Sequence, residues 1–146
     1  MDYELISHTA DIGIRVKGVT LKALFLNAAE ATFDVIAEAK KPLGALGLAE
    51  RWALGAREFS IALKAPNVKE LFVRWLSELV SLSDAKDVHF IRFDIKDFSE
   101  TALQAVAFGL PREHFQGKIE IKAVTYHALK VGKKGGGFEA EVIFDV

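Results

Sequence analysis

Residues 59–82, FSIALKAPNVKELFVRWLSELVSL, change their apolar period half-way along. Phe59, Ile61 and Leu63 recur at every second position, which predicts a strand with one buried face. Pro66 interrupts this pattern and is followed by a helical period. The apolar residues that then share one helical face are Val68, Leu71, Phe72, Trp75, Leu76, Leu79 and Leu82. The segment therefore predicts a strand followed by a long amphipathic helix.

Two polar residues indicate where the predicted helices begin. Asn67, with Glu70 three residues later, resembles a capping box in which Asn replaces the usual Ser or Thr. A second helical period runs from position 21 to 36, and Thr20 is placed to cap the free N–H groups of its first turn. Pro42 and Gly44 are expected to end that helical segment.

The rest of the chain predicts strands. Apolar alternation is clear in residues 12–17, where Ile12, Ile14 and Val16 alternate with polar or small residues. A Gly-rich turn at 132–137 predicts a hairpin between the last two strand candidates. The predicted strands are residues 3–6, 12–17, 88–95, 102–108, 119–131 and 138–144. We expect an α+β fold, with two amphipathic helices packed on a mainly antiparallel β-sheet, in a single domain over residues 1–146.

Length and composition exclude several classes of protein. A chain of 146 residues builds its core without disulfides, and the absence of Cys rules out thiol nucleophiles, zinc–thiolate sites and Fe–S clusters. Nineteen basic against twenty acidic residues argue against an extended nucleic-acid-binding surface. No apolar run is long enough to span a membrane, and the acidic N-terminus differs from a secretory signal. These features predict a soluble protein in the cytoplasm that does not bind membranes.

Two carboxylates are candidates for cation binding. Asp11 lies at the start of a predicted strand, where an alternative role is to cap the turn. Asp145 follows the last strand and precedes Val146, whose terminal carboxylate would add a second anionic group. Hard divalent cations prefer such oxygen ligands, and a third carboxylate from elsewhere would make a Ca²⁺ or Mg²⁺ site. The alternative for Asp145 is a frayed, solvated end.

Other chemistry has weaker support. His89 and His114 have no second metal ligand at short spacing. His8 and His127 flank strands with polar residues, and each is a candidate for a general base or for structural hydrogen bonds. Phosphate-binding loop motifs are absent from the sequence. The lysines between positions 118 and 134 predict a solvated hairpin edge rather than a phosphate-binding patch.

Three segments together resemble the archease family. They are HTADIG at 8–13, KAVTYH at 122–127 and VIFDV at 142–146, and the resemblance extends over the whole chain, including the helix that carries RWLSEL at 74–79. It implies an archease-like fold and a small cytosolic cofactor of an RtcB-type RNA ligase. Such a cofactor promotes guanylylation of the ligase and multiple turnover in tRNA splicing and RNA repair, without catalysing the ligation itself.

The resemblance also implies a metal site. The family's ligands correspond to Asp11, Asp145 and the terminal residue Val146. Three oxygen donors do not fill a Ca²⁺ shell, so water or the partner must complete it; Ca²⁺ is favoured, with Mg²⁺ or Mn²⁺ as alternatives. The residues expected to shape or flank this site without catalytic roles are His8, Lys122, Tyr126 and His127. The stretch 40–57 matches no family motif.

Two rival functions stay open from the sequence. One is a metal-independent chaperone-like or scaffold module that binds a protein client. The other is a small metal-dependent hydrolase, which has no nucleophile–base pair to support it. The expected partner is an RtcB-type ligase, with RNA contacted only through that ligase.

Overall fold

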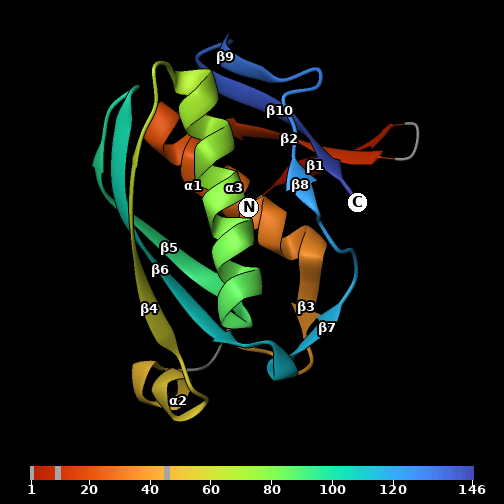
Figure 1. The fold of residues 1–146 in the computed structure, drawn as a ribbon, viewed down its shortest axis with the longest axis vertical. Helices are drawn as coiled ribbons and strands as arrows, with labels where there is room; N and C mark the ends of the chain where they lie inside the picture. Colours follow the sequence, from red (N-terminus) through yellow and green to blue (C-terminus); the bar gives the residue numbers. More distant parts are fainter. Residues whose placement is uncertain (1, 9–10, 45–46) are drawn as a thin grey trace.

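The computed structural model describes residues 2–8, 11–44 and 47–146, except for the side chains of Ser7 and His8. The elements are β1 (Tyr3–His8), β2 (Asp11–Gly18), α1 (Leu21–Ile36), β3 (Ala37–Ala39), α2 (Leu48–Ala53), β4 (Arg57–Lys64), α3 (Val68–Lys86), β5 (Val88–Phe98), β6 (Ala102–Pro111), the 3₁₀ turn η1 (Arg112–His114), β7 (Phe115–Gly117), β8 (Ala123–Val124), β9 (Lys130–Lys134) and β10 (Gly137–Asp145). The helices and strands, though not η1, are labelled in Figure 1. Among the described residues, no helix is both long and apolar enough to cross a membrane.

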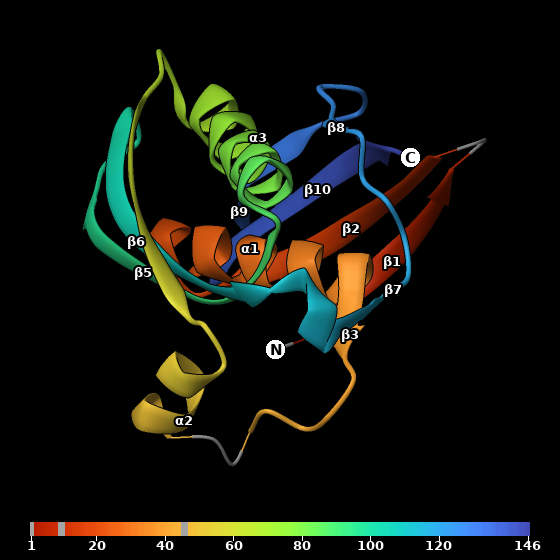
Figure 2. The same cartoon turned by 60° about the horizontal axis from the view of Figure 1, so that its bottom comes forward.

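The described strands form three antiparallel sheets. The first has the order β1-β2-β10-β8, with β9 also paired to β10; the second is β4-β6-β5, and the third is the short pair β3-β7. Figure 2 shows α1 and α3 between the two larger sheets. The α+β class predicted from the sequence is confirmed, with both long helices covered by a sheet on each side and the short α2 added.

Apolar side chains from all these layers form one main core. Trp75 of α3 is fully buried, and its indole N–H donates a hydrogen bond to the carbonyl oxygen of Phe25 in α1 at 2.9 Å. Phe25 also meets Phe72 and Phe98 edge-on, with ring centroids 5.2 and 4.9 Å apart. Edge-to-face contacts add to the burial of apolar area, so these rings fix how the helices and sheets pack.

The two long helices begin where the sequence predicts. The Thr20 hydroxyl accepts a hydrogen bond from the N–H of Ala23, and the Asn67 side chain accepts one from the N–H of Glu70, each at 3.0 Å. Both bonds satisfy a free N–H of the first turn. A capping box has two hydrogen bonds, and the bond that Asn67 accepts from the N–H of Glu70 is one of them. The Glu70 carboxylate lies 3.6 Å from Arg74 in an ion pair.

Two predicted boundaries are wrong. The first long helix covers the predicted period and ends at Ile36, but Pro42 and Gly44 do not end it, because residues 37–39 already pair with β7. Residues 119–131 do not form one strand: within them only β8 and the first two residues of β9 are strand. Between these two strands Ala128 has a φ of 52°, and the N–H of Leu129 donates to the carbonyl of Tyr126 in a turn. Left-handed backbone at a non-glycine residue is incompatible with a continuous strand.

The predicted hairpin is confirmed with a shorter turn. Lys134 pairs with Gly137, which leaves Gly135 and Gly136 as the two turn residues. Gly135 has a φ of 59°, which glycine adopts without steric cost. The hairpin extends the first sheet along the same edge of β10 that β8 borders.

Candidate functional site

The end of β10 lies beside the start of β2. Phe144 pairs with Ile12, so one residue further along this antiparallel register Asp145 lies opposite Asp11. Side chains alternate between the faces of a sheet, and Phe144 is buried on the inner face. The two carboxylates therefore share the outer face. Figures 1 and 2 both show the C-terminus beside this end of β2.

Hydrogen bonds hold the end of β10 in place. The N–H of Lys122 donates to the carbonyl oxygen of Asp145 at 2.7 Å. Thr125 donates twice to the carbonyl of Ile143, through its N–H at 3.0 Å and its hydroxyl at 2.9 Å. Val146 packs against the main core, whereas Asp145 is exposed. The alternative of a frayed end is therefore not supported, and the Asp145 side chain is presented from an ordered strand.

A glycine allows the two strands to approach closely beside this site. A Cβ atom at Gly13 would lie 2.5 Å from the carbonyl oxygen of Val142 and 2.7 Å from Cδ1 of Ile143. Carbon atoms do not approach so closely without displacement, and here one obstacle is backbone. Gly13 lies next to Ile12, so any displacement reaches the start of β2 where Asp11 lies.

We predict that Gly13→Ala lowers the free energy of unfolding by about 1–3 kcal/mol, the usual cost of overpacking. Urea denaturation measures this change. Gly132→Ala is the control, because a Cβ atom there meets nothing within 4 Å. Equal stability of the two variants would show that β2 and β10 do not need the glycine.

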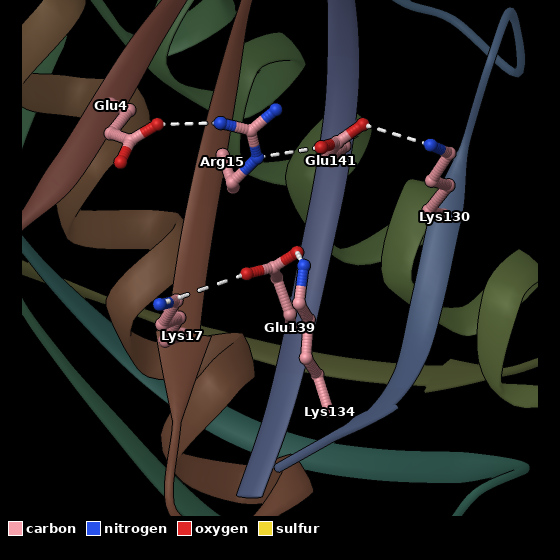
Figure 3. A network of polar contacts seen from close by, with 7 residues as sticks. All are labelled: Glu4, Arg15, Lys17, Lys130, Lys134, Glu139 and Glu141. Atoms are coloured by element: carbon pink, nitrogen blue, oxygen red, sulfur yellow. Dashed lines mark hydrogen bonds and ion pairs between the residues drawn. The ribbon is translucent and has the colours of Figure 1, made fainter.

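An ion-pair network covers the rest of the outer face, as Figure 3 shows. Arg15 lies between Glu4 and Glu141, with N–O distances of 2.5 and 2.6 Å, and Lys130 reaches Glu141 at 3.6 Å. The hydrogen bond from Arg15 keeps the pKa of the Glu141 carboxyl below its ordinary value. In a parallel row, Glu139 contacts Lys17 at 4.0 Å and Lys134 at 3.2 Å. These lysines are paired along the sheet, in agreement with a solvated hairpin edge.

The donors at the end of the sheet are of the type that a hard cation binds, but they are too few to fill its coordination shell. Among the described residues, no group of three or more His, Asp or Glu side chains is close enough to hold a metal ion. Asp11 and Asp145 offer carboxylate oxygens and Val146 offers a main-chain oxygen. Oxygen donors are the type that Ca²⁺, Mg²⁺ and Mn²⁺ bind, so the chemistry fits a cation whose shell is completed by water or a partner.

The flanking residues lie in different environments. Lys122, Tyr126 and His127 are exposed along the segment that carries β8, and the N–H of His127 donates to the Thr125 hydroxyl at 3.3 Å. The His8 side chain, with Thr9 and Ala10 of the HTAD motif, lies outside the described residues. The backbone of His8 pairs with Asp11 in the β1–β2 register.

Sequence reasoning missed a second polar location, at His89 of β5. Its side chain is 6% exposed and stacks on Phe115 with ring centroids 4.2 Å apart. Burial lowers the pKa of His89 from 6.5 to about 4, with help from the positive charge of Arg112. The only sequence signal was a histidine within the strand-like run VHFIRF.

This histidine makes stability depend on pH. Its pKa is lower in the folded than in the unfolded protein, so between pH 6.5 and 4 the unfolded chain binds more protons and stability falls as the pH falls. We expect this effect to total about 3 kcal/mol, at roughly 1.4 kcal/mol for each pKa unit. Urea denaturation at pH 7, 5.5 and 4 is expected to show a shallower loss for His89→Gln than for the wild type. Parallel profiles for the two proteins would contradict this prediction.

Comparison with known proteins completes the description of the chain. The model of the archease protein family matches residues 3–146. The chain belongs to the archease family. The archease of Methanosarcina mazei is 35% identical over 99% of this chain and 95% of its own length. The archease of Archaeoglobus fulgidus is 32% identical over the full length of both chains.

Solved structures agree with the archease assignment. The solution structure of a Methanobacterium thermoautotrophicum protein matches with a TM-score of 0.66 at 27% identity, over 99% of this chain and 98% of the other. A Thermotoga maritima crystal structure, described as an archease and "possible chaperone", matches with a TM-score of 0.64 at 22% identity, over 97% and 94%. The archease resemblance inferred from HTADIG and VIFDV is therefore confirmed at the level of family and fold.

Proposed function

We propose that the chain activates an RtcB-type RNA ligase by promoting its guanylylation and multiple turnover in tRNA splicing and RNA repair. The observation that carries this proposal is membership of the archease family over residues 3–146. The placement of Asp11 and Asp145 at one end of the outer sheet face supports the expected metal site. The chain is an accessory protein that acts in the cytoplasm and contacts RNA only through the ligase.

In this proposal a divalent cation, Ca²⁺ or alternatively Mg²⁺ or Mn²⁺, is held by Asp11, Asp145 and a main-chain oxygen of Val146. A bound cation supplies positive charge that stabilises phosphate groups during nucleotidyl transfer. The residues of this chain hold and orient it: the hydrogen bond from Lys122 to Asp145 and the packing of Val146 fix the strand end. The incomplete donor set leaves positions that the ligase can fill.

A metal-independent chaperone-like role is the second candidate, favoured by the description of the Thermotoga maritima structure as a "possible chaperone". The experiment that separates the two follows covalent guanylylation of a cognate RtcB-type ligase with labelled GTP, with and without this chain, over a series of free Ca²⁺ and Mn²⁺ concentrations. Stimulation that requires free cation above the ligase's own need supports the metal mechanism. Stimulation at every cation level supports the chaperone role, and no stimulation contradicts the activator proposal.

A further inference from the structure

A cleft of about 400 Å³ opens at the end of the molecule opposite the β9–β10 hairpin. Figure 1 shows the end of α3, η1 and β7 together there. The N–H groups of Lys118 and Ile119 both donate to the carbonyl oxygen of Ile36, at 2.8 and 3.2 Å, and this fixes the segment after β7 against the end of α1. The volume lies within the range of small-molecule pockets.

A buried polar group faces this cleft. His89 lines it with its ring packed between Phe33 and Phe115, and the imidazole makes no hydrogen bond to any residue in the described ranges. Among the described residues, the buried side-chain nitrogen or oxygen without a hydrogen-bond partner is Arg51 Nε, so the imidazole nitrogens of His89 reach the cleft rather than being sealed in the core. The ring of a residue that is 6% exposed thus presents its polar edge to the cleft, where a ligand can accept from it or donate to it.

Two cationic groups stand beside the imidazole. Arg112 donates to Asp84 at 2.5 Å and to the Ser83 hydroxyl at 3.1 Å, which holds its guanidinium against α3. Lys118 lines the same cleft and has no ion pair with a described residue. Both charges lower the pKa of His89, while the negative charge of Asp34 raises it. Asp84 and Glu120 also line the cleft, and Arg112 is paired with Asp84 at 2.5 Å and with Asp87 at 4.0 Å, so Lys118 is the cation that carries the attraction for an anion.

The remaining wall is apolar. Its hydrophobic residues come from α1, α3, β7 and the segment after it: Ile36, Val80, Phe115, Ile119 and Ile121. Phe115 and Ile121 are buried with the core. The cleft thus combines a few converging polar groups with a largely apolar wall, the composition typical of sites that bind organic molecules.

We propose that this cleft binds a small organic anion, with its carboxylate or phosphate group at Lys118, Arg112 and His89 and its apolar body against Phe115 and Ile119. Lys118 attracts the charged group, the guanidinium of Arg112 adds N–H donors beside it, and the imidazole of His89 donates to it from the cleft wall. This inference does not rest on the proposed ligase function.

The test uses NMR titration of the full chain with phenyl phosphate, benzoate and, as the uncharged counterpart, benzyl alcohol. We expect saturable shifts at the His89 imidazole and the Phe115 amide for at least one of the two anions. The anion that binds more tightly identifies phosphate or carboxylate as the preferred group. We expect the affinity for benzyl alcohol to be lower by at least about fivefold, because benzyl alcohol lacks the charge that Lys118 and Arg112 attract.

The control variants keep the test specific. Lys118→Gln is expected to weaken binding of the anion by about fivefold, because it removes one charged donor. Lys133→Gln makes the same change in the β9–β10 hairpin and should leave binding unchanged. No saturable shift with either anion, equal binding of benzyl alcohol, or equal loss in both lysine variants would overturn the proposal.

Discussion

Asp145→Asn is expected to reduce the affinity of the chain for Ca²⁺ by at least about tenfold, because it removes one of the few charged ligands of the proposed site. The side chain is exposed at the end of β10, while the carbonyl of the same residue accepts the hydrogen bond from Lys122. The substitution therefore removes charge without removing a backbone interaction. Isothermal titration calorimetry with Ca²⁺ and with Mn²⁺ measures the change directly.

Glu139→Gln is the matched control for this prediction. Glu139 lies on the same strand and the same outer face, and the variant loses one negative charge, but its carboxylate pairs with Lys17 and Lys134. It should bind cations like the wild type. Circular dichroism and thermal unfolding then confirm that Asp145→Asn is folded. Equal cation affinity in Asp145→Asn and the wild type would remove Asp145 from the metal site.

Trp75→Ala is expected to have the largest effect on stability, a loss of about 3–5 kcal/mol. Trp75 is fully buried between the two large sheets, so its removal leaves a cavity that the surrounding layers cannot fill. It also leaves the carbonyl of Phe25 without the indole N–H. Since small domains have total stabilities of about 5–15 kcal/mol, this one change removes a large part of the total.

Two further variants show how much of this loss comes from the indole N–H and how much depends on burial. Trp75→Phe keeps much of the ring but deletes the N–H, and we expect it to lose about 1–3 kcal/mol for the unsatisfied carbonyl in addition to the smaller cavity. Trp52→Ala removes the 43% exposed tryptophan of α2 and should change stability by less than about 0.5 kcal/mol. Urea denaturation compares all three. A Trp75→Ala variant as stable as Trp52→Ala would contradict the described core.

The parts of the fold set by local interactions were predictable from the sequence. The Thr20 and Asn67 caps and the Gly135 turn depend on neighbours within three residues, and each lies where the sequence indicates. Pro42 and Gly44 were wrongly expected to end α1, because residues 37–39 already pair with Phe115–Gly117, far along the chain. Local patterns contain no information about such distant partners.

In the candidate site, too, the local features were predictable and the long-range pairing was not. Exposed Asp145 lies on the face opposite buried Phe144, as the alternation of side chains along a strand requires. Alternation alone gave no reason to bring Asp11 beside it, because the β2–β10 pairing joins residues at opposite ends of the chain. Ile143 shares the outer face with Asp145 but is buried, and its side chain lies against Gly13 of β2. The cleft at His89 depends on four separate segments and was not foreseen.

The central claim, that this chain activates an RtcB-type ligase through its carboxylates, is tested most directly by multiple-turnover RNA ligation with the cognate ligase in excess RNA. The assay compares no addition, the wild type, Asp11→Asn and Glu139→Gln at one fixed free Ca²⁺ or Mn²⁺ concentration. We predict several ligations per ligase with the wild type and with Glu139→Gln, and about the unstimulated level with Asp11→Asn. Full stimulation by folded Asp11→Asn would contradict the carboxylate mechanism, and no stimulation by the wild type would contradict the activator function itself.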